Sequence, residues 1–477
     1  MNKYIYGMIS QYIYKSNNKI GLFFLLTTII ILFSLMGLNA HQYEYERNLI
    51  CIMFGGAMFV YYNTIRSCRF DFFHPIHIYM FFYICIFFIT PIFLIDIGEE
   101  KCMGVDIMSG CIKATFIVLL GLMAFCLGYK NVKTSEVQLP VRKLNEKIER
   151  KILRTSYVIF IIIYIISLGY AMRSGKTLAS IFSLGTLTYT RIYQDTGDQL
   201  LFLINVSYSL LIPWLFICVY GKSKLVKLLT SFLLFSLFVS YGWRFIIYIM
   251  ILGYLIVHTR ISGKKIKFVK IFLLGVILIL YSTIQGAIRN DIRSGNKANF
   301  EGFSMENIAY TLKSNFNIYQ PFYAVADKYP SQYDFYYGQS CFVYPIIMWI
   351  PRFIWKDKPL GKDYPNCVAT KKAINESAIT DAAFSYPNIF EYYIDFGTIG
   401  VLFISYILGC ICKKMQRHYN SSSTYDIIIY AIFIGFLIQF INRGNLSQLM
   451  TLLFFLFIPI RFYRKYFIKF QKNEGYQ

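Results

Sequence analysis

Charged residues are scarce in this chain. Only 15% of its 477 residues are Asp, Glu, Lys or Arg, against roughly 25% in an ordinary soluble domain. Hydrophobic residues make up 56%. Apolar runs of about 14 to 24 residues recur from end to end, and most are about long enough to cross a bilayer core of roughly 30 Å as a helix. The composition excludes a soluble enzyme and predicts an all-α polytopic membrane protein.

Several signatures of common chemistry are also missing. The eleven cysteines form no CxxC pair, and the chain has no P-loop and no GxGxxG sequence. We therefore expect no metal site, no cofactor and no ATP-driven pump. His74 and His77 are expected to cap a helix or snorkel at the inner side rather than bind a metal. Spacing does not decide whether two cysteine pairs form disulfides on the outer side: Cys102 with Cys111, and Cys341 with Cys367.

Apolar ranges and charge together predict the topology. With the N-terminus inside, the segments on the inner side carry nearly the whole net charge of +23, as the positive-inside rule requires. Both termini are therefore predicted to be cytoplasmic, and no nucleic acid is needed to explain the charge. The first apolar range is too long for a cleavable signal peptide and starts too late. The twelve predicted spans are 21–38, 48–65, 76–95, 112–128, 156–172, 200–220, 225–240, 243–257, 269–283, 389–412, 427–441 and 446–459.

Two features of this topology stand out. The run from 225 to 257 has basic clusters at both ends, so it must cross twice, with the turn at Tyr241-Gly242-Trp243-Arg244. Within the long connection predicted between the ninth and tenth spans, residues 341–355 are apolar but are interrupted by two prolines. This pattern predicts an interfacial or re-entrant element. The predicted parts are transmembrane helices over 1–284, a large outer (periplasmic) loop domain over 285–388, and three further helices with a basic tail over 389–477.

Arginines gather at the predicted outer ends of the helices. Arg244 and Arg443 each lie in a short hairpin beside a glycine, which leaves them little freedom to reach bulk water. Snorkelling to lipid phosphates is one interpretation. The other is a convergent anion site, because a guanidinium binds phosphate bidentately and keeps its charge. The candidates for binding a lipid pyrophosphate are Arg244, Arg289, Arg293, Arg352 and Arg443.

Acidic and aromatic residues accompany these arginines. Glu391 and Asp395 lie one helical turn apart at the start of the tenth span, so both are candidates for a general base or for the partner of an arginine. Tyr323, Tyr336 and Tyr337 belong to a tyrosine-rich part of the outer loop. Such residues commonly form an interfacial belt, and the alternative is stacking on the apolar faces of sugar rings.

Several short motifs, each present once, lie in order along most of the chain. They are FDFFHPIHIY at 70–79, YGWRF at 241–245, IRNDIRSG at 288–295, IPRFIWKDKP at 350–359, the stretch 391–400 and the hairpin Asn442-Arg443-Gly444. Together they resemble the Wzy-type polymerases of O-antigen and capsular repeat units. The sequence departs from that pattern at Trp243, where many relatives have a small residue before the hairpin arginine.

This resemblance implies a metal-independent glycosyltransferase with a GT-C-like fold and no cofactor. It implies polymerisation of undecaprenyl-pyrophosphate-linked oligosaccharides at the outer face of the bacterial inner membrane. The arginines would neutralise the pyrophosphate leaving group, and Glu391 or Asp395 would accept the proton of the attacking sugar hydroxyl. Membrane lipids and a chain-length regulator protein are the further partners that it allows. An O-antigen ligase, which shares the arginines and the large outer loop, and a repeat-unit flippase stay open as alternatives.

Overall fold

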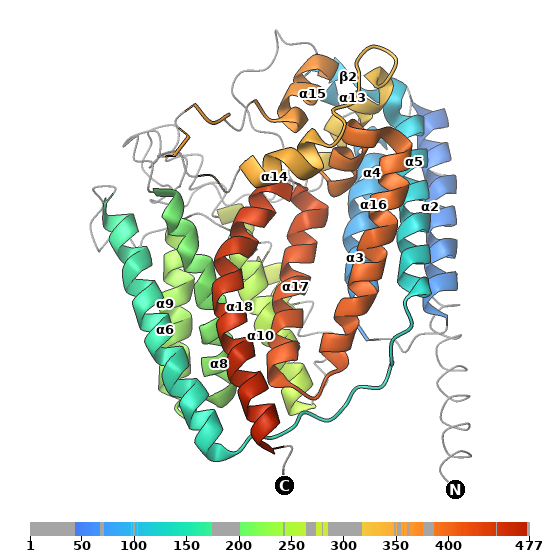
Figure 1. Cartoon of the computed structure of the whole chain (residues 1–477). Coiled ribbons are helices and arrows are strands. Elements are labelled where there is room, and N and C mark those ends of the chain that lie inside the picture. The colour runs from blue at the N-terminus through green and yellow to red at the C-terminus, as the bar shows by residue number, and fades with distance from the viewer. Residues whose placement is uncertain are drawn as a thin grey trace, which may run out of the picture.

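The computed structural model of the chain is a bundle of long helices (Figure 1). It describes residues 43–66, 71–96, 98, 101–102, 104–173, 201–241, 244–263, 273–278, 280–284, 317–347, 350, 354–355, 357–359, 363–374, 386–444 and 446–474.

Helices dominate the described residues, and two-residue strands form one antiparallel pair. The elements in chain order are α2 Glu44–Ile65, α3 Pro75–Ile84, η1 Cys85–Ile89, α4 Thr90–Asp96, β1 Lys101–Cys102, β2 Val105–Asp106, η2 Met108–Gly110, α5 Cys111–Asn131, α6 Glu146–Arg173, η4 Leu201–Leu210, α8 Leu211–Tyr220, α9 Lys224–Ser240, α10 Arg244–Ser262, η6 Asn317–Tyr319, α13 Gln320–Lys328, η7 Gln339–Val343, α14 Tyr344–Ile347, α15 Pro365–Ile374, α16 Asn388–Asn420, α17 Thr424–Arg443 and α18 Leu446–Glu474.

The helices confirm an all-α polytopic membrane protein. Every predicted range except 21–38, which lies outside the described residues, coincides with helix over the residues that are described. The range 269–283 is described only at 273–278 and 280–283. The predicted break in the run from 225 to 257 is also present, because α9 ends at Ser240 and α10 begins at Arg244. The total of twelve spans stays a prediction. Seven described helices are long and apolar enough to cross a membrane: Glu44–Ile65, Pro75–Ile95, Met108–Asn131, Glu146–Gly169, Arg244–Ser262, Asn388–Asn420 and Thr424–Arg443.

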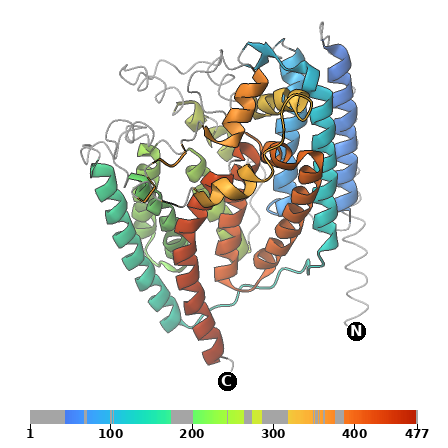
Figure 2. The same ribbon diagram turned by 45° about the horizontal axis from the view of Figure 1, so that its top comes forward.

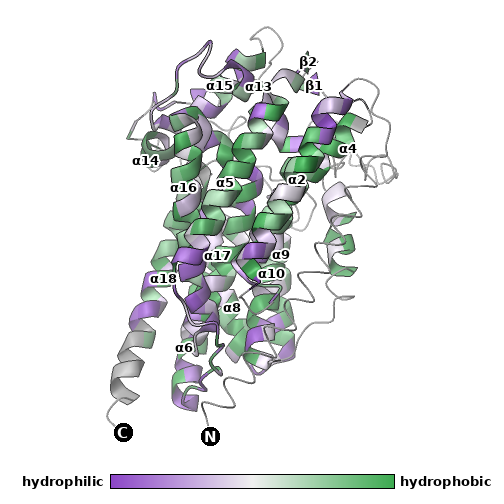
Figure 3. Ribbon diagram, turned by 90° about the vertical axis from the view of Figure 1, so that its right-hand side faces the viewer, coloured by the Kyte–Doolittle hydropathy of each residue, from purple (hydrophilic) through white to green (hydrophobic). Residues whose placement is uncertain are grey.

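The two ends of the bundle differ (Figures 1 and 2). The short elements of residues 317–347 and 363–374, here called the cap, lie over one end of the long helices. Residues 132–145, here called the connector, run along the opposite end from α5 to α6. Hydrophobic residues follow the lengths of the helices, and hydrophilic residues are frequent in the cap and the connector (Figure 3). The bundle therefore has an apolar middle and two polar ends.

A kink in α16 joins the bundle to the cap. Gly397 has φ 62° and ψ −153°, a region open essentially to glycine alone. An added Cβ would also lie 2.8 Å from the ring of Phe335. The kink releases two helix carbonyls, and those of Ile394 and Asp395 accept hydrogen bonds from the N–H groups of Tyr336 (2.9 Å) and Tyr337 (3.0 Å). The sequence predicted an uninterrupted helix here, because glycine is common in membrane helices and the kink depends on the distant cap.

The predicted interfacial segment and the possible disulfides can also be located. The start of 341–355 forms the end of η7 and all of α14, which lies across the end of the bundle near α17 and α18 (Figure 1). Its position in a membrane stays a prediction. Neither of the two possible disulfides is formed: Cys102, Cys111, Cys341 and Cys367 are all free thiols.

Candidate functional site

Two of the predicted arginines lie near one another at the cap end, where the packed helices α10 and α17 begin and end. Arg244 is the first residue of α10 and Arg443 the last of α17, and their charges are close enough to interact. Arg244 is half-buried and donates from Nη1 to the backbone oxygen of Ser282 at 3.2 Å, whereas Arg443 is exposed. Like charges repel, so an anion between the two guanidinium groups would be stabilised by both. The other predicted arginines, Arg289, Arg293 and Arg352, lie outside the described residues.

Two neighbours of this arginine pair were missed from the sequence. Tyr248 lies one helical turn after Arg244 and within electrostatic reach of both arginines. Its hydroxyl hydrogen-bonds with the hydroxyl of Ser282, so Ser282 contacts Tyr248 through its side chain and Arg244 through its backbone. The spacing of four residues on one helix could have indicated Tyr248. Ser282 comes from a different helical segment and left no signal in the local sequence.

Glu391 lies in the first turn of α16 and is 1% exposed. Its two carboxylate oxygens accept from the N–H of Leu446, at 3.2 and 3.1 Å. Leu446 begins α18, and a helix start offers N–H groups without partners in the helix and a partial positive charge. Asn366 of α15 donates from Nδ2 to Oε1 of the same carboxylate at 2.7 Å. Glu391 thus joins α16, α18 and the cap.

Asp395 lies one turn further along α16 and is fully buried. Its carboxylate accepts from the N–H groups of Ser340 (3.1 Å) and Cys341 (2.7 Å), at the start of η7. Burial raises the pKa of the Cys341 thiol well above its usual range, and the nearby charges of Glu391 and Asp395 act in the same direction. Both predicted acids therefore lie on one buried face, as their spacing indicated, and both accept backbone hydrogen bonds.

The three predicted tyrosines occupy different environments. Tyr323 is buried between α13 and α5, where its hydroxyl lies 3.1 Å from the hydroxyl of Thr115. Tyr336 is half-buried, and the ammonium group of Lys372 lies 6.0 Å from its ring centroid. Burial raises the pKa of Tyr336. Tyr337 is 74% exposed and has φ 49°, a conformation that is unusual for a bulky side chain. Only Tyr336 and Tyr337 offer ring surface to solvent.

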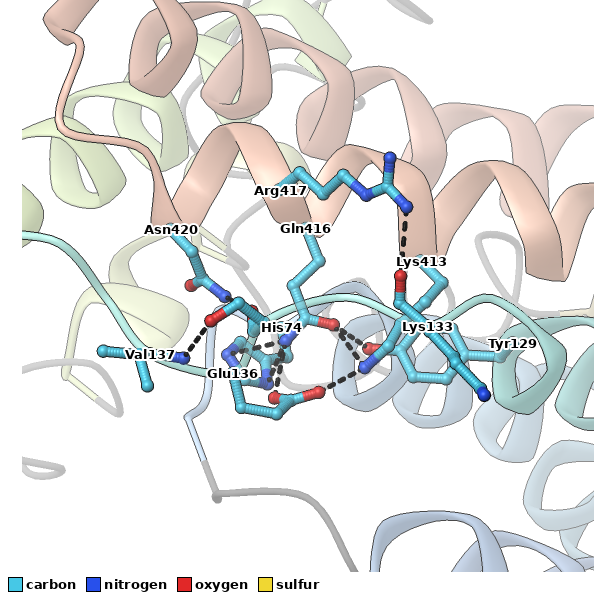
Figure 4. A network of polar contacts seen from close by, with 10 residues as sticks. His74, Tyr129, Lys133, Glu136, Val137, Lys413, Gln416, Arg417 and Asn420 are labelled. Carbon is cyan, nitrogen blue, oxygen red and sulfur yellow. Dashed lines mark hydrogen bonds and ion pairs between the residues drawn. The ribbon is translucent and has the colours of Figure 1, made fainter. Parts of the chain in front are cut away.

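A second polar cluster, here called the connector junction, lies at the opposite end of the bundle (Figure 4). Gln416 of α16 is at its centre and accepts from the Tyr129 hydroxyl at 2.7 Å and from Lys413 Nζ at 3.0 Å. Its own amide donates to Glu136 of the connector at 2.9 Å and reaches a ring nitrogen of His74 at 3.4 Å. Lys413 also pairs with Glu136. This cluster bonds the connector to α16.

The predicted histidine pair belongs to the same region. His74 is the residue before α3, but its side chain makes no capping hydrogen bond. The rings of His74 and His77 are buried and stacked, with centroids 6.1 Å apart. The His77 ring nitrogen Nδ1 lies 2.6 Å from the Tyr61 hydroxyl. Both histidines are therefore packed and hydrogen-bonded inside the protein and do not snorkel. Among the described residues, no group of three or more His, Cys, Asp or Glu is arranged to hold a metal ion.

These observations describe a multi-pass helical membrane protein with two arginines near one another at one end of its bundle. The chain belongs to the O-antigen polysaccharide polymerase Wzy family, whose model matches residues 20–471. This confirms the resemblance found in the sequence and establishes the general activity as O-antigen polymerisation. No curated protein and no solved structure matched the chain.

Proposed function

We propose that this protein polymerises undecaprenyl-pyrophosphate-linked oligosaccharide repeat units at the outer face of the bacterial inner membrane. The closeness of Arg244 and Arg443, at the end where the packed helices α10 and α17 begin and end, carries this proposal. The pair offers two permanent positive charges at one end of the bundle, where a lipid pyrophosphate could place its head group while its chain stays in the membrane. Arg289, Arg293 and Arg352 would add to this charge.

The charge distribution supports placing the cap on the outer side. Basic residues are frequent at the connector end, and the positive-inside rule assigns such an end to the cytoplasm. The cap would then face the periplasm, with both chain termini cytoplasmic, in a GT-C-like arrangement of about twelve spans. Basic residues whose contacts place them at the connector end include Lys133, Arg142, Arg260, Lys413 and Arg417.

The proposed reaction joins the glycans of two lipid carriers. The hydroxyl of the acceptor sugar attacks the anomeric carbon of the donor glycan, a glycosidic C–O bond forms, and the bond from that carbon to the pyrophosphate oxygen breaks. Negative charge develops on the departing pyrophosphate, and two guanidinium groups directed at it stabilise the transition state. Because the arginines supply this stabilisation, the proposed reaction requires no metal.

The geometry bears on which group accepts the proton of the acceptor hydroxyl. Glu391 and Asp395 are buried, and both already accept backbone N–H groups. Both carboxylates are enclosed and engaged by the protein, and a general base must come within hydrogen-bond reach of the substrate hydroxyl. The geometry therefore favours the alternative in which the departing pyrophosphate itself takes the proton. The role of either acid as the base stays a prediction, for which Glu391→Gln is the test.

Sugar recognition is proposed for the exposed rings of the cap. Tyr337 projects to solvent from a strained backbone position that is held by its hydrogen bond to the carbonyl of Asp395. Strained residues that the surrounding structure holds in place are frequent at functional sites. The ring of Tyr336 would provide a second aromatic face for stacking on a sugar. Tyr323 is enclosed between helices and would contribute packing.

The proposal is tested with purified protein in liposomes and synthetic lipid-linked repeats. The wild type should convert single repeats to a ladder of lipid-linked polymers without a lipid A acceptor, and a chelator should not change the rate. Arg443→Ala should convert single repeats far more slowly, while Arg417→Ala, which removes an exposed arginine at the connector end, should turn over normally. Transfer only to lipid A would indicate a ligase, and transbilayer movement without new glycosidic bonds would indicate a flippase.

A further inference from the structure

The hairpin that carries Arg443 is fixed by neighbours from outside α17 and α18. Gly444 follows Arg443 with φ 45° and ψ −115°, a backbone region that disfavours other residues. A Cβ at this position would lie 2.7 Å from the carbonyl oxygen of Tyr386 and 3.1 Å from that of Pro387, just before α16. The hairpin therefore packs directly against the start of α16.

Glu391 holds the other side of this hairpin. Its carboxylate accepts the N–H of Leu446, three residues after Arg443. The interaction satisfies a donor that the helix start leaves without an intrahelical partner, and it places a negative charge where the helix dipole favours one. Because so few residues separate Arg443 from Leu446, a shift at the start of α18 must also shift the end of α17.

The same carboxylate is the end of a hydrogen-bonded chain from the cap. The Ser340 hydroxyl donates to Asn366 Oδ1 at 2.6 Å, and Asn366 Nδ2 donates to Glu391 at 2.7 Å. Asp395 anchors the backbone of Ser340. Ser340 and Asn366 are buried, as is Glu391, so these bonds are shielded from water and costly to break. The chain links η7 and α15 to the hairpin of Arg443.

We propose that Glu391 is a positioning residue, which sets the distance between the guanidinium groups of Arg443 and Arg244 and makes that distance depend on how the cap is docked. The inference rests on the proposed function only in taking Arg443 as a ligand of pyrophosphate. Glu391 acts through Arg443 and does not touch the reacting atoms. Occupation of the cap by the glycan and occupation of the arginine pair by the pyrophosphate would then be coupled.

A labelling experiment without substrate tests the positioning. Arg443→Cys in a background without native cysteines presents a thiol whose rate of reaction with a charged methanethiosulfonate reports the position of the hairpin. Adding Glu391→Leu or Asn366→Leu should change this rate by roughly fivefold or more, the equivalent of a lost helix cap. Adding Ser331→Ala, a change at a cap residue whose hydroxyl bonds to backbone oxygens of α13, should not. Equal rates in all four proteins would overturn the proposal.

Kinetics with lipid-linked repeats separates positioning from base catalysis. Glu391→Gln keeps an oxygen that can accept the N–H of Leu446, so it should retain most of kcat and the wild-type pH profile, and Glu391→Leu should lower kcat/KM with an unchanged pH profile. In an Arg443→Ala background, Glu391→Leu should have little further effect, because its route of action has been removed. Loss of kcat in Glu391→Gln at unchanged KM, with a changed pH profile, would establish a base and overturn the proposal. If the wild type forms no polymer, the proposed function fails while the labelling result still decides the positioning.

Discussion

The two polar ends of the bundle differ in how their basic residues are grouped. At the connector junction, Lys413 pairs with Glu136, and Arg260 donates to the backbone oxygens of Tyr419, Leu139 and Ser421 at 2.7 to 3.2 Å. These cations are matched by acceptors within the protein. At the cap end, Arg244 and Arg443 are brought towards one another. Two like charges near one another make this end the candidate for binding an external anion, because such an anion would relieve their repulsion.

Removing one arginine from each end gives the strongest test of this difference between the ends. Arg244→Ala or Arg443→Ala should lower the polymerisation rate per folded protein by on the order of 10²-fold, equivalent to roughly 3 kcal/mol of lost transition-state stabilisation. Arg260→Ala should instead lower thermal stability with little change in rate per folded protein. The measurement is the turnover of purified variants together with their melting in detergent. A site at the connector end would reverse the two results.

A smaller effect is expected when the charge is kept and the geometry is changed. Lysine retains the positive charge but cannot form the planar bidentate fork. Arg443→Lys should therefore recover part of the rate, to within roughly tenfold of the wild type. Single-turnover rates with a synthetic donor measure this. Full recovery would mean that the pair acts only through its net field, and no recovery would mean that bidentate contact is indispensable.

The kink at Gly397 determines how the cap meets the bundle. Gly397→Ala should destabilise that contact by roughly 1–3 kcal/mol, because the backbone conformation is strained for alanine and the methyl group would meet Phe335. Hydrogen exchange should then rise in residues 334–347. Gly263→Ala is the control, since Gly263 also has a positive φ (65°) but has nothing within 4 Å of an added Cβ. Equal effects of the two changes would show that contact with the cap is not involved.

At the connector junction the expected effect is on stability alone. Glu136→Gln leaves the nearly buried Lys413 without its carboxylate and should cost roughly 1–2 kcal/mol, less than for a fully buried pair because Glu136 is 30% exposed. Adding Lys413→Met should restore part of the loss. Thermal unfolding in detergent measures both. Unchanged melting with reduced polymerisation would instead assign this cluster a part in the reaction.

Much of the architecture follows from the sequence, because length and apolarity determine where helices can cross a membrane. The predicted break before Arg244 depended only on local charge and hydropathy, and it was confirmed. The kink at Gly397 and the role of Ser282 were missed because they depend on contacts between distant segments. The two acids show most clearly what the sequence alone cannot predict. Their spacing correctly placed Glu391 and Asp395 on one helix face. It did not indicate that their partners are the backbone N–H groups of Leu446, Ser340 and Cys341, which come from distant segments.

The orientation of the two ends has a test that should leave activity unchanged. In a background without native cysteines, a membrane-impermeant maleimide should label Ser331→Cys in the cap of intact cells with a permeabilised outer layer. It should not label Ser422→Cys, which lies between α16 and α17 at the connector end. The opposite pattern would place the arginine pair on the cytoplasmic side and remove the proposed outer-face reaction.

Binding of undecaprenyl pyrophosphate to purified protein tests the central claim most directly. Titration of wild type, Arg244→Ala, Arg443→Ala and Arg417→Ala by native mass spectrometry gives the Kd for each. The paired-arginine site predicts a Kd raised by on the order of 10²-fold in the first two variants, from the loss of a charge-assisted contact, and an unchanged Kd in Arg417→Ala. Equal affinities in all four proteins would contradict the claim that Arg244 and Arg443 form the pyrophosphate site.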